Sequence, residues 1–384
     1  MPPHIPEKMR AYQLQADGKV RLTVVPVPAL GPHDALVRIT QASVCGTDLQ
    51  IIKQDDWAKE NVPEGTIIGH EGAGSIVALG EKTNGEFVIG EFVALESHYA
   101  CDTCITAGKL LDDCREQGIV GVYGIKRPDG TRGMPRSGTF AEYVAMPMGS
   151  LHHVPKELIE NFQASLLEPA GNSWKIAEHF RAVGVPKTVA VFGCGSHGIF
   201  TQMFFKHIGV QQLVAVDPDA KRRAFAGTLA ADVVTVPNGL TADFLGEQGI
   251  LHIDAALDIT GVPGVVDQAI TLVNPGGTVV MFGLPKSPEQ HVDGVSYDKI
   301  IFESRQFDLQ RNGKTVHVIG FNGRSVEGWK TLITELTQSA ALRAKLMWPL
   351  EKIGTLEQLG AIIATIGSGT PLGDHKIGMT GFPE

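Results

Sequence analysis

The chain has 384 residues, of which 43% are hydrophobic and 20% charged, and a formal net charge of -9 at pH 7. This composition is typical of a globular protein with room for two or three domains, each with a sizeable core. The acidic balance and the lack of a Lys/Arg cluster argue against a nucleic-acid partner.

The first ten residues contain no apolar segment, so no signal peptide is expected. Apolar runs elsewhere are interrupted by Gly, Pro or charged residues before they could span a bilayer. Five cysteines in a chain of this length are too few for a disulfide framework. We therefore expect free thiols and metal ligands, in a reducing cytoplasm.

Up to about residue 150, β-branched or alternating runs between Gly and Pro turns predict mostly β-structure. Strands are expected at residues 35–39, 74–80 and 139–144. Residues 99–138 are polar and turn-rich and contain three of the cysteines. This stretch predicts an elaborated loop.

From about residue 162 the pattern changes to buried strands that alternate with helices. Strands are predicted at residues 189–192, 213–216, 233–236, 253–257, 278–282 and 315–319. This alternation is typical of an α/β fold with a doubly wound parallel sheet. Two amphipathic helices are predicted after it, near residues 326–338 and 356–366.

A glycine-rich motif, GCGSHG at residues 193–198, follows the first of these strands and opens a helix. In dinucleotide-binding folds the first glycine makes the turn, the second admits the pyrophosphate, and the third packs the helix on the strand. The helix N-terminus then offers free N–H groups to the phosphates. The alternative is a glycine turn in a fold without a cofactor.

Asp217 ends the next predicted strand, where a carboxylate accepts hydrogen bonds from ribose hydroxyls and repels a 2′-phosphate. It favours NAD over NADP, although Lys221, Arg222 and Arg223 lie close enough in sequence to accommodate a phosphate. The predicted cofactor-binding residues are Gly193, Gly195, Ser196, His197, Gly198, Asp217 and Arg222.

Cys45, His70 and Glu71 supply a thiolate, an imidazole and a carboxylate, each beside a glycine. That set suits a zinc ion with three protein ligands and a fourth position open for a substrate oxygen. The alternative is a buried structural cysteine and an unrelated surface His-Glu pair. The glycine motif at residues 193–198 favours the metal site, because dinucleotide-binding motifs are typical of redox enzymes.

Together these motifs resemble those of the zinc-dependent medium-chain dehydrogenase/reductase superfamily. The resemblance rests on CGTD at 45–48, GHEG at 69–72, GTFAEY at 138–143, the glycine motif with Asp217, and NPGG at 274–277. It implies a mostly-β, GroES-like catalytic domain formed by residues 1–169 and 323–384. It also implies a Rossmann domain that binds NAD, formed by residues 170–322.

The resemblance further implies that Cys45 and His70 bind a catalytic zinc. Threonine and polyol dehydrogenases add a carboxylate directly after the histidine, here Glu71, and a later one that Glu168 matches. Glu168 would bind the metal directly or through water. Alternatively, it is a carboxylate at a helix start, stabilised by the helix dipole.

The same resemblance gives roles to the two residues that end the CGTD motif. Thr47 would hydrogen-bond the reacting oxygen and begin a proton path to solvent. Asp48 would accept the second N–H of His70 and so fix its tautomer. Many relatives continue that path with His or Tyr where this chain has Gln50, so water, Glu168 or His98 would have to replace it. His98 is otherwise an ordinary surface or capping histidine.

Cys101, Cys104 and Cys114 lie where many members carry a four-cysteine lobe that binds a structural zinc. Ala107 and Arg115 occupy two of the usual cysteine positions. Three thiols with Asp112 or Asp113 would still close a tetrahedral site. A lobe without metal, held by packing, is the alternative.

These features predict zinc-dependent oxidation of a polar secondary alcohol by NAD: a polyol, cyclitol, sugar or 3-hydroxy amino acid such as threonine. Residues 123–130 loosely resemble glucose dehydrogenases, which keeps sugar oxidation open. A zinc-free, NADPH-dependent quinone or enone reductase is a second candidate, and a non-catalytic nucleotide-binding protein is a third. Family members are commonly dimers or tetramers that pair through the edge of the nucleotide-binding sheet, so a homo-oligomer is expected.

Overall fold

The computed structural model describes residues 4–83, 85–109, 111–114, 116–127, 132–159, 163–285, 289–321, 325–367 and 376–383. It divides into two compact units. The first unit comprises Met1–Pro169 and Ser325–Glu384, and the second comprises Ala170–Arg324. The predicted boundary between residues 322 and 323 lies outside the described residues.

The second unit alternates strands and helices along the chain. Its strands are β10 (Thr188–Phe192), β11 (Gln212–Val216), β12 (Val233–Thr235), β13 (Ala255–Asp258), β14 (Thr278–Met281), β15 (His291–Val292), β16 (Val295–Ser296), β17 (Gln306–Arg311) and β18 (Lys314–Gly320). Its helices are α5 (Leu167–Val183, which begins in the first unit), α6 (Ser196–Ile208), α7 (Ala220–Leu229), the short η5 (Pro237–Gly239), α8 (Ala242–Glu247), α9 (Val265–Leu272) and α10 (Tyr297–Phe302).

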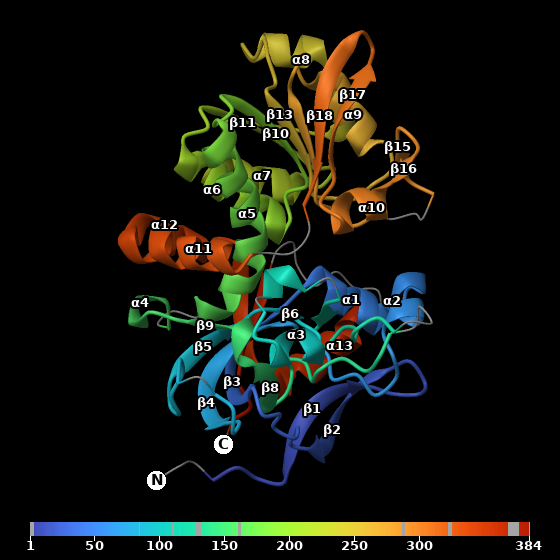
Figure 1. The fold of residues 1–384 in the computed structure, drawn as a ribbon. Coiled ribbons are helices and arrows are strands. Elements are labelled where there is room, and N and C mark those ends of the chain that lie inside the picture. The colour runs from blue at the N-terminus through green and yellow to red at the C-terminus, as the bar shows by residue number, and fades with distance from the viewer. Residues whose placement is uncertain are drawn as a thin grey trace. The chain divides into compact units, whose positions relative to one another are not determined.

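The main sheet of the second unit has the strand order β12-β11-β10-β13-β14-β18-β17. All neighbours pair in parallel except β17, which forms an antiparallel hairpin with β18. Figure 1 shows the green α6 and the gold α9 on opposite sides of this sheet. The doubly wound α/β sheet expected from the sequence is therefore confirmed.

Residues of β10 explain why this sheet is covered on both faces. All five are buried, and alternate side chains of a strand point to opposite faces. Ala190 and Phe192 pack in one core with Val266 and Ala269 of α9. A strand buried on both sides gives the continuous apolar run by which the sequence predicted it.

One element of this sheet differs from prediction. The strand expected at residues 315–319 is observed as β18, but its antiparallel hairpin partner β17, which precedes it, was not expected. The hairpin turns at Asn312 and Gly313, both with positive φ. The alternation in β17 is weak, because Leu309 is its one fully buried residue among exposed Gln, Asp and Arg side chains.

The first unit is mostly β-structure and contains both ends of the chain. Its strands are β1 (Lys8–Leu14), β2 (Val20–Pro26), β3 (Asp34–Val44), β4 (Glu71–Leu79), β5 (Phe92–Leu95), β6 (His98–Tyr99), β7 (Gly118–Ile119), β8 (Tyr143–Pro147), β9 (Leu151–His153), β19 (Leu350–Thr355) and β20 (Lys376–Thr380). Its helices are α1 (Gly46–Lys53), α2 (Asp56–Asn61), α3 (Asp102–Thr106), η1 (Leu111–Asp113), η2 (Met148–Ser150), α4 (Lys156–Ile159), η4 (Ala164–Leu166), α11 (Val326–Gln338), α12 (Ala340–Leu346), η6 (Leu356–Gln358) and α13 (Leu359–Gly367).

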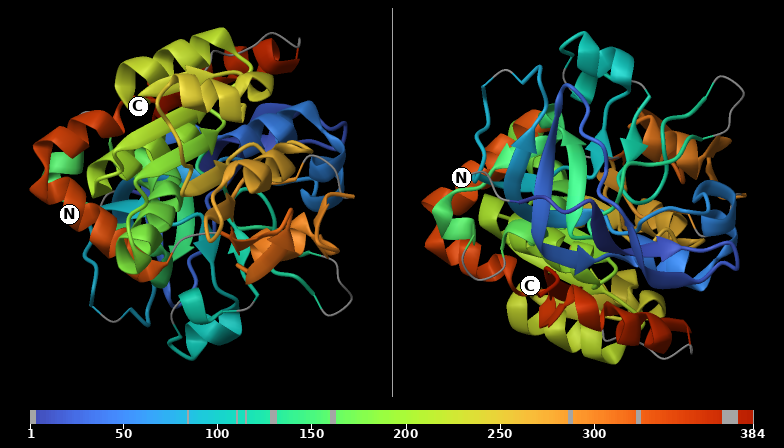
Figure 2. Two further views of the ribbon diagram at one scale, coloured as in Figure 1. Left: turned by 90° about the horizontal axis from the view of Figure 1, so that it is seen from above. Right: turned by 90° about the horizontal axis from the view of Figure 1, so that it is seen from below.

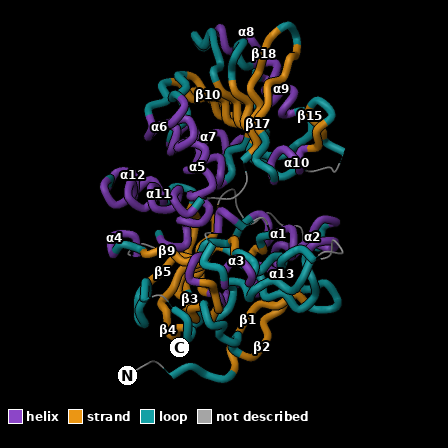
Figure 3. Tube along the Cα trace, in the orientation of Figure 1, coloured by secondary structure: helices purple, strands orange, loops and turns teal. Residues whose placement is uncertain are grey.

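Strand β3 organises this unit, because it pairs with β20, β4 and β8. The strand path runs β19-β20-β3-β4-β5-β9, and only β19 and β20 are parallel neighbours within it. The β1–β2 hairpin, dark blue in the right-hand view of Figure 2, joins the rest through bridges at Ala11 and Gln13. Figure 3 shows α1, α2 and α13 grouped beside the strands.

The expected strand at residues 139–144 is partly wrong, because β8 runs from Tyr143 to Pro147. Residues 139–142 instead form bends and a bridge beside β1. Thr139 and Phe140 donate their N–H groups to Gly69 and Ile68, which fixes this segment against the start of β4.

Among the described helices, none combines the length and hydrophobicity needed to cross a lipid bilayer.

Candidate functional site

The CGTD motif sits at the turn from β3 into α1. Cys45 is the N-cap of α1, with extended backbone angles, and its N–H donates to Asp48 Oδ2 at 2.8 Å. Asp48 is therefore the acidic partner of a capping box, a local arrangement that fixes the first turn of the helix. Thr47, at the second helical position, is half-buried. The turn thus holds the thiol of Cys45 at the end of a central strand.

The GHEG motif sits at the start of β4, opposite that turn. Gly69 has a φ of +96°, and a Cβ there would lie 2.7 Å from the ring of Phe140 and 2.8 Å from its backbone nitrogen. Glycine is therefore required at this position. Glu71 pairs with Ser43 across the β3–β4 ladder. This register brings the GHEG motif beside the residues that precede Cys45.

The three predicted first ligands come together in the structure. One ligand atom from each of Cys45, His70 and Glu71 lies within 4.8 Å of the other two. His70 Nδ1 lies 3.4 Å from Asp48 Oδ1, which leaves Nε2 as the nitrogen for a metal. Both atoms are buried, and neither has a hydrogen-bond partner among the residues that the structure describes. A half-buried thiol with a buried imidazole and a buried carboxylate at this spacing fits a zinc ion.

The charges around His70 differ from those around a solvated histidine. Burial alone would lower the pKa of His70, but the carboxylate of Asp48 and the thiol of Cys45 raise it well above its usual value. The surroundings therefore favour a cation at this imidazole. A divalent metal bound to the imidazole would balance the neighbouring negative charges as a proton does.

Lys376 is the residue of this site that the sequence analysis missed. It opens β20, which pairs with β3 at Val44, and it is only 1% exposed. Its Nζ lies 2.7 Å from both carboxylate oxygens of Glu71 and 3.3 Å from Val44 O. The hydroxyl of Ser43 donates to the same carboxylate. A lysine in a short apolar strand was the available signal, because lysine is almost never fully buried unless paired.

The pKa values of this pair follow from burial and from their neighbours. Burial raises the pKa of Glu71, Lys376 and His70 lower it, and Glu168 raises it further, so it stays above its usual value. Burial would lower the pKa of Lys376, but Glu71, Cys45 and Glu168 raise it. Since all these groups lie near one another, the donor set and Lys376 form one electrostatic cluster.

Glu168 is the second residue of α5 and is 4% exposed. It is not among the three residues whose ligand atoms lie within 4.8 Å of one another, although it is near enough to raise the pKa of Glu71. The preceding turn, η4, is held on β3 by Ser165, whose N–H donates to Gln41 Oε1 at 3.4 Å. The structure thus places Glu168 beside the cluster rather than within it.

Gln50 and His98 have other contacts. Gln50 donates to Asp55 Oδ2 at 3.0 Å, a bond that ties α1 to the N-cap of α2. His98 Nδ1 lies 3.1 Å from Ser97 Oγ and 3.5 Å from Glu96 Oε1. Glu96 is buried and accepts from Trp329 Nε1 of α11. His98 therefore belongs to a polar group around Glu96.

The second cysteine cluster also forms. One ligand atom from each of Cys101, Cys104 and Cys114 lies within 4.8 Å of the others, and the Sγ atoms of Cys101 and Cys114 are 3.7 Å apart. Burial opposes ionisation of Cys101, but N–H groups of Cys104 and Thr103 and the neighbouring thiols lower its pKa. The thiols of Cys101 and Cys114 raise the pKa of Cys104 to about 11. Arg115 lies outside the described residues, as do residues 128–130 of the glucose-dehydrogenase-like segment.

The glycine motif has the backbone that a dinucleotide needs. Gly193 has a φ of +103°, and a Cβ on Gly198 would lie 2.0 Å from Gly193 O. A Cβ on Gly195 would meet nothing within 4 Å, so open space lies over the start of α6. Ser196 and His197, the first two residues of that helix, are half-buried and have N–H groups without helical partners. These features fit a pyrophosphate at the helix N-terminus.

Asp217 lies beside this loop at the end of β11. Its Oδ2 accepts the N–H of Cys194 and its Oδ1 that of Asp219, each at 2.8 Å. Arg223 donates to the backbone carbonyl of Asp217 at 2.7 Å. Arg222 donates its N–H to Asp219, while its buried Nε has no partner among the described residues. The predicted cofactor residues therefore gather at one end of the parallel sheet, beside the switch point between β10 and β13.

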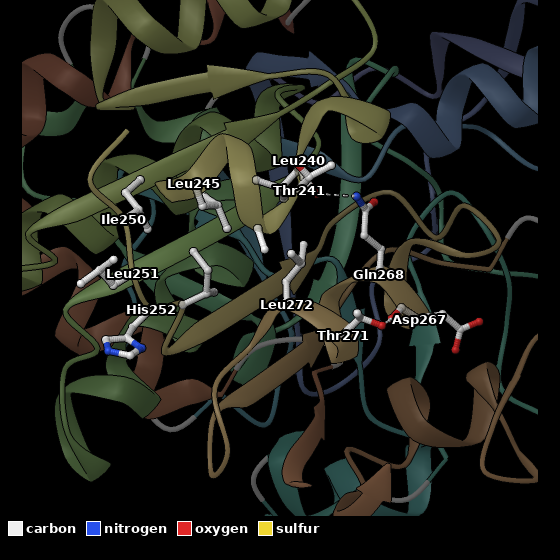
Figure 4. Close-up of a pocket in the computed structure, with 12 residues that line it drawn as sticks. Leu240, Thr241, Leu245, Ile250, Leu251, His252, Asp267, Gln268, Thr271 and Leu272 are labelled. Atoms are coloured by element: carbon white, nitrogen blue, oxygen red, sulfur yellow. Dashed lines mark hydrogen bonds between the residues drawn. The ribbon is translucent and has the colours of Figure 1, made fainter. Parts of the chain in front are cut away.

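A separate hollow in the second unit is not this site. It has a volume of about 520 Å³, and Figure 4 shows Leu240, Leu245 and Leu272 around it, with His252 and Gln268 on opposite sides. None of the predicted cofactor residues lines it. Its segment 250–253 precedes β13, so it lies at the amino ends of the strands, whereas dinucleotides bind at the carboxyl ends.

Comparison with known proteins decides the family. The pattern described as "Alcohol dehydrogenase GroES-like domain" matches residues 31–156, and that described as "Zinc-binding dehydrogenase" matches residues 198–338. L-threonine 3-dehydrogenase of Aeromonas salmonicida (strain A449) is 31% identical over 295 residues, which cover 76% of this chain and 80% of that enzyme. The chain belongs to the zinc-dependent medium-chain dehydrogenase/reductase superfamily.

Further relatives place it in the threonine and polyol branch of that superfamily. L-threonine 3-dehydrogenase of Escherichia coli O139:H28 is 31% identical over 294 residues, covering 76% of this chain and 80% of that enzyme. The fold matches 2R,3R-butanediol dehydrogenase of Bacillus subtilis with a TM-score of 0.73 at 22% identity, covering 98% of this chain and 100% of that one. It also matches galactitol-1-phosphate dehydrogenase of Escherichia coli with a TM-score of 0.73 at 20% identity, covering 97% of this chain and 99% of that one.

Membership in this superfamily confirms the expected fold class, a Rossmann sheet with a mostly-β GroES-like part. It also establishes that the protein is an oxidoreductase of the alcohol dehydrogenase type, with zinc and a nicotinamide cofactor. The first unit carries the thiol, imidazole and carboxylate cluster, and the second carries the glycine motif.

Proposed function

We propose that this protein oxidises a polar secondary alcohol with NAD, using a zinc ion held at the end of β3. The observation that carries the proposal is the cluster of Cys45, His70 and Glu71, which each place one ligand atom within 4.8 Å of the others, with His70 and Glu71 buried. A structural role alone would not require a buried imidazole and a buried carboxylate beside a thiol, because ionisable groups lose hydration on burial. A divalent cation compensates that loss.

The proposed roles of the surrounding residues follow from their contacts. When bound, zinc supplies Lewis acidity that lowers the pKa of an alcohol. Cys45 and His70 would hold it, together with Glu71 or Glu168 as the carboxylate. Asp48 faces His70 Nδ1 at 3.4 Å and would keep that nitrogen protonated, so that Nε2 is available. Thr47, half-buried in the first turn of α1, would hydrogen-bond the substrate hydroxyl and take its proton outward.

NAD is proposed over NADP because of Asp217. Its carboxylate is held by two backbone N–H groups beside the glycine loop, so it cannot turn away from a ribose placed there. A 2′-phosphate would face this fixed negative charge. Arg222, whose Nε lacks a partner among the described residues, is the group that would favour NADP instead.

The substrate class is proposed from the relatives. The two relatives described above, each 31% identical, are L-threonine 3-dehydrogenases, and the fold neighbours include a butanediol and a galactitol-1-phosphate dehydrogenase. All of these names describe polar molecules with a hydroxyl group. A 3-hydroxy amino acid or a polyol is therefore the proposed substrate. The intact metal donor set disfavours a zinc-free quinone or enone reductase.

We also propose a structural zinc site, a cellular location and an oligomeric state. The thiols of Cys101, Cys104 and Cys114 would hold a structural zinc with a non-thiol fourth ligand. All five cysteines are free, which supports a reducing, cytoplasmic location. A homo-oligomer, dimer or tetramer, would pair through an edge of the nucleotide-binding sheet, where β12 and β17 are the edge strands.

A substrate panel tests the proposed function. Purified protein would be mixed with NAD or NADP and with threonine, polyols, inositols or aldoses, and formation of the reduced cofactor followed by absorbance. We expect turnover with at least one of these alcohols and a higher kcat/KM with NAD. Cys45→Ala should lose that turnover yet bind NAD with unchanged affinity in calorimetry, because the glycine loop belongs to the other unit. Equal turnover by Cys45→Ala would refute the metal site.

A further inference from the structure

Cys101 and Cys114 hold their sulfur atoms next to each other in the first unit. The two Sγ atoms are 3.7 Å apart, and the backbone N–H of Cys101 donates to Cys114 Sγ at 3.3 Å. Cys114 Sγ also donates to Glu116 O at 3.2 Å, which fixes its position beside Cys101. A disulfide bond is about 2.05 Å long, so the two sulfurs need to approach by less than about 2 Å to form one.

The two thiols of this pair differ in their access to solvent. Cys101 is half-buried, whereas Cys114 is only 5% exposed. A small oxidant therefore reaches Cys101 first, and the buried thiol of Cys114 lies directly beside the sulfur that has been oxidised. An accessible thiol with a second thiol next to it, which can displace the oxidised oxygen, is the arrangement found at reversible cysteine oxidation sites.

The lobe that contains this pair has fewer thiols than a full structural zinc site. Ala107 and Arg115 stand at two of the usual cysteine positions. Among the side chains that the structure describes, the metal-binding group in this lobe consists of the three cysteines. Three thiols do not fill the four positions of a tetrahedral zinc site by themselves. Zinc would therefore be held less tightly here than by four thiolates, which leaves the thiols more available for other chemistry.

We propose that Cys101 and Cys114 form a reversible disulfide when the protein meets a peroxide. The thiolate of Cys101 attacks one oxygen of hydrogen peroxide, the O–O bond breaks, and hydroxide leaves, so that Cys101 becomes a sulfenic acid. The sulfur of Cys114 then attacks the sulfur of Cys101, the S–O bond breaks, and water leaves with the proton of the Cys114 thiol. The two sulfurs together lose two electrons and the peroxide gains them. A dithiol reductant reverses the change by thiol–disulfide exchange.

The inference goes beyond the proposed oxidation of an alcohol, because it uses none of the groups around Cys45. It shares its thiols with the proposed structural zinc. Once Cys101 and Cys114 are joined, Cys104 is the one thiol of the three that remains, so the disulfide and a zinc ion exclude each other in this lobe. Val326, the first residue of α11, packs against the apolar cluster that contains Cys114. The oxidation therefore occurs where α11 begins.

Peptide mapping of the full-length protein tests the pairing. Reduced protein is treated with hydrogen peroxide, alkylated, and digested with trypsin without a reductant. Trypsin cleaves after Lys109, so it separates Cys114 from the peptide of residues 83–109, which contains the other two cysteines of the lobe. We expect mass spectrometry to find the two peptides joined, with Cys104 alkylated. The intact chain should be lighter by two hydrogen atoms, and dithiothreitol should remove the link.

Two variants assign the link to its residues. Cys104→Ser is the matched control, because it removes a thiol of the same cluster and keeps the proposed pair. It should form the link as the wild type does. Cys114→Ser should lose the link and keep sulfenic acid at Cys101, which dimedone labels, because the thiol that displaces the oxygen is gone.

Two results from the wild type would overturn the inference. One is a failure of peroxide to join the two peptides. The other is a link between Cys101 and Cys104, seen as the single peptide 83–109 lighter by two hydrogen atoms. Both leave the proposed function intact, because the reduced protein would still oxidise an alcohol. Reduced protein without turnover on any alcohol would instead count against the proposed function, and the disulfide would still form.

Discussion

Asp48 serves two groups at the end of β3. One carboxylate oxygen accepts the N–H of Cys45 at 2.8 Å, and the other faces His70 Nδ1 at 3.4 Å. A single side chain thereby holds the backbone of Cys45 and faces the imidazole of His70. At the scale of residues, the metal site depends on this carboxylate as much as on the groups that would touch the metal.

Asp48→Asn separates these two tasks. The amide oxygen can still cap α1, so the melting temperature should change little, whereas the charge that favours a protonated Nδ1 is lost. We expect zinc affinity to fall about 10–100-fold, the usual cost of losing a partner behind a metal ligand. Competition with a chelator of known affinity measures it. Unchanged zinc affinity would show that the contact with His70 has no role in metal binding.

The residues that the sequence could identify were those with a recognisable pattern. Cys45, His70 and Glu71 lie beside glycines in short motifs, and the structure brings them within 4.8 Å of one another. Lys376 had no such motif, and it reaches Glu71 only because β20 pairs with β3 across more than 300 residues of chain. Contacts of this kind cannot be inferred from local spacing.

At the scale of elements, the turn from β10 into α6 requires two glycines for different reasons. Gly198 lies so close to Gly193 that a Cβ would be 2.0 Å from its carbonyl oxygen. Gly195 faces open space, where a Cβ would meet nothing within 4 Å. Gly198 is needed for the fold, whereas Gly195 keeps open the space that the cofactor would occupy.

Substitution by alanine should separate these two requirements. Gly198→Ala should lower the free energy of unfolding by more than about 2 kcal/mol, since backbone must move. Gly195→Ala should unfold as the wild type does but bind NAD at least about tenfold more weakly, because its methyl group fills the space for the pyrophosphate. Urea denaturation and calorimetric titration with NAD measure the two effects. Equal effects of the two variants on stability would contradict this assignment.

Helix α11 returns the chain to the first unit and is fixed there by Trp329. Its indole donates to buried Glu96 and stacks on His152, with ring centroids 4.2 Å apart. Trp329→Phe keeps an aromatic ring but removes the hydrogen-bond donor, so the free energy of unfolding should fall by about 1–3 kcal/mol. Trp348→Phe is the control, because Trp348 is half-buried and Lys345 Nζ lies over its ring, 5.3 Å from the centroid. Urea denaturation of both variants checks this, and equal losses would argue against the bond to Glu96.

Elements with strong patterns were predicted well, and those defined by distant partners were not. The helix at residues 326–338 is observed as α11, and the parallel strands of the second unit lie within two residues of their predicted positions. Strand β20, by contrast, is defined by its pairing with β3 and β19. In the β17–β18 hairpin, the exposed polar residues of β17 leave little apolar alternation from which to predict it. Tertiary pairing decides such strands more than local preference does.

At the scale of the whole molecule, the protein divides the chemistry between two units. The first unit, built from both ends of the chain, contains the proposed metal donors Cys45, His70 and Glu71, and the second contains the loop that fits a dinucleotide. The sequence predicted this division, because its motifs fall in separate regions of different periodicity. It could not predict the substrate, since loop side chains rather than the fold determine which alcohol is accepted.

The central claim is that zinc at the Cys45 site is required for oxidation of the alcohol. The most direct measurement follows NAD reduction with an accepted alcohol before chelation, after removal of the metal, and after zinc is returned. We predict that activity disappears with the metal and comes back with about one zinc per chain at this site, the number expected for a mononuclear catalytic centre. Full activity in protein shown by mass spectrometry to contain no metal would contradict the account.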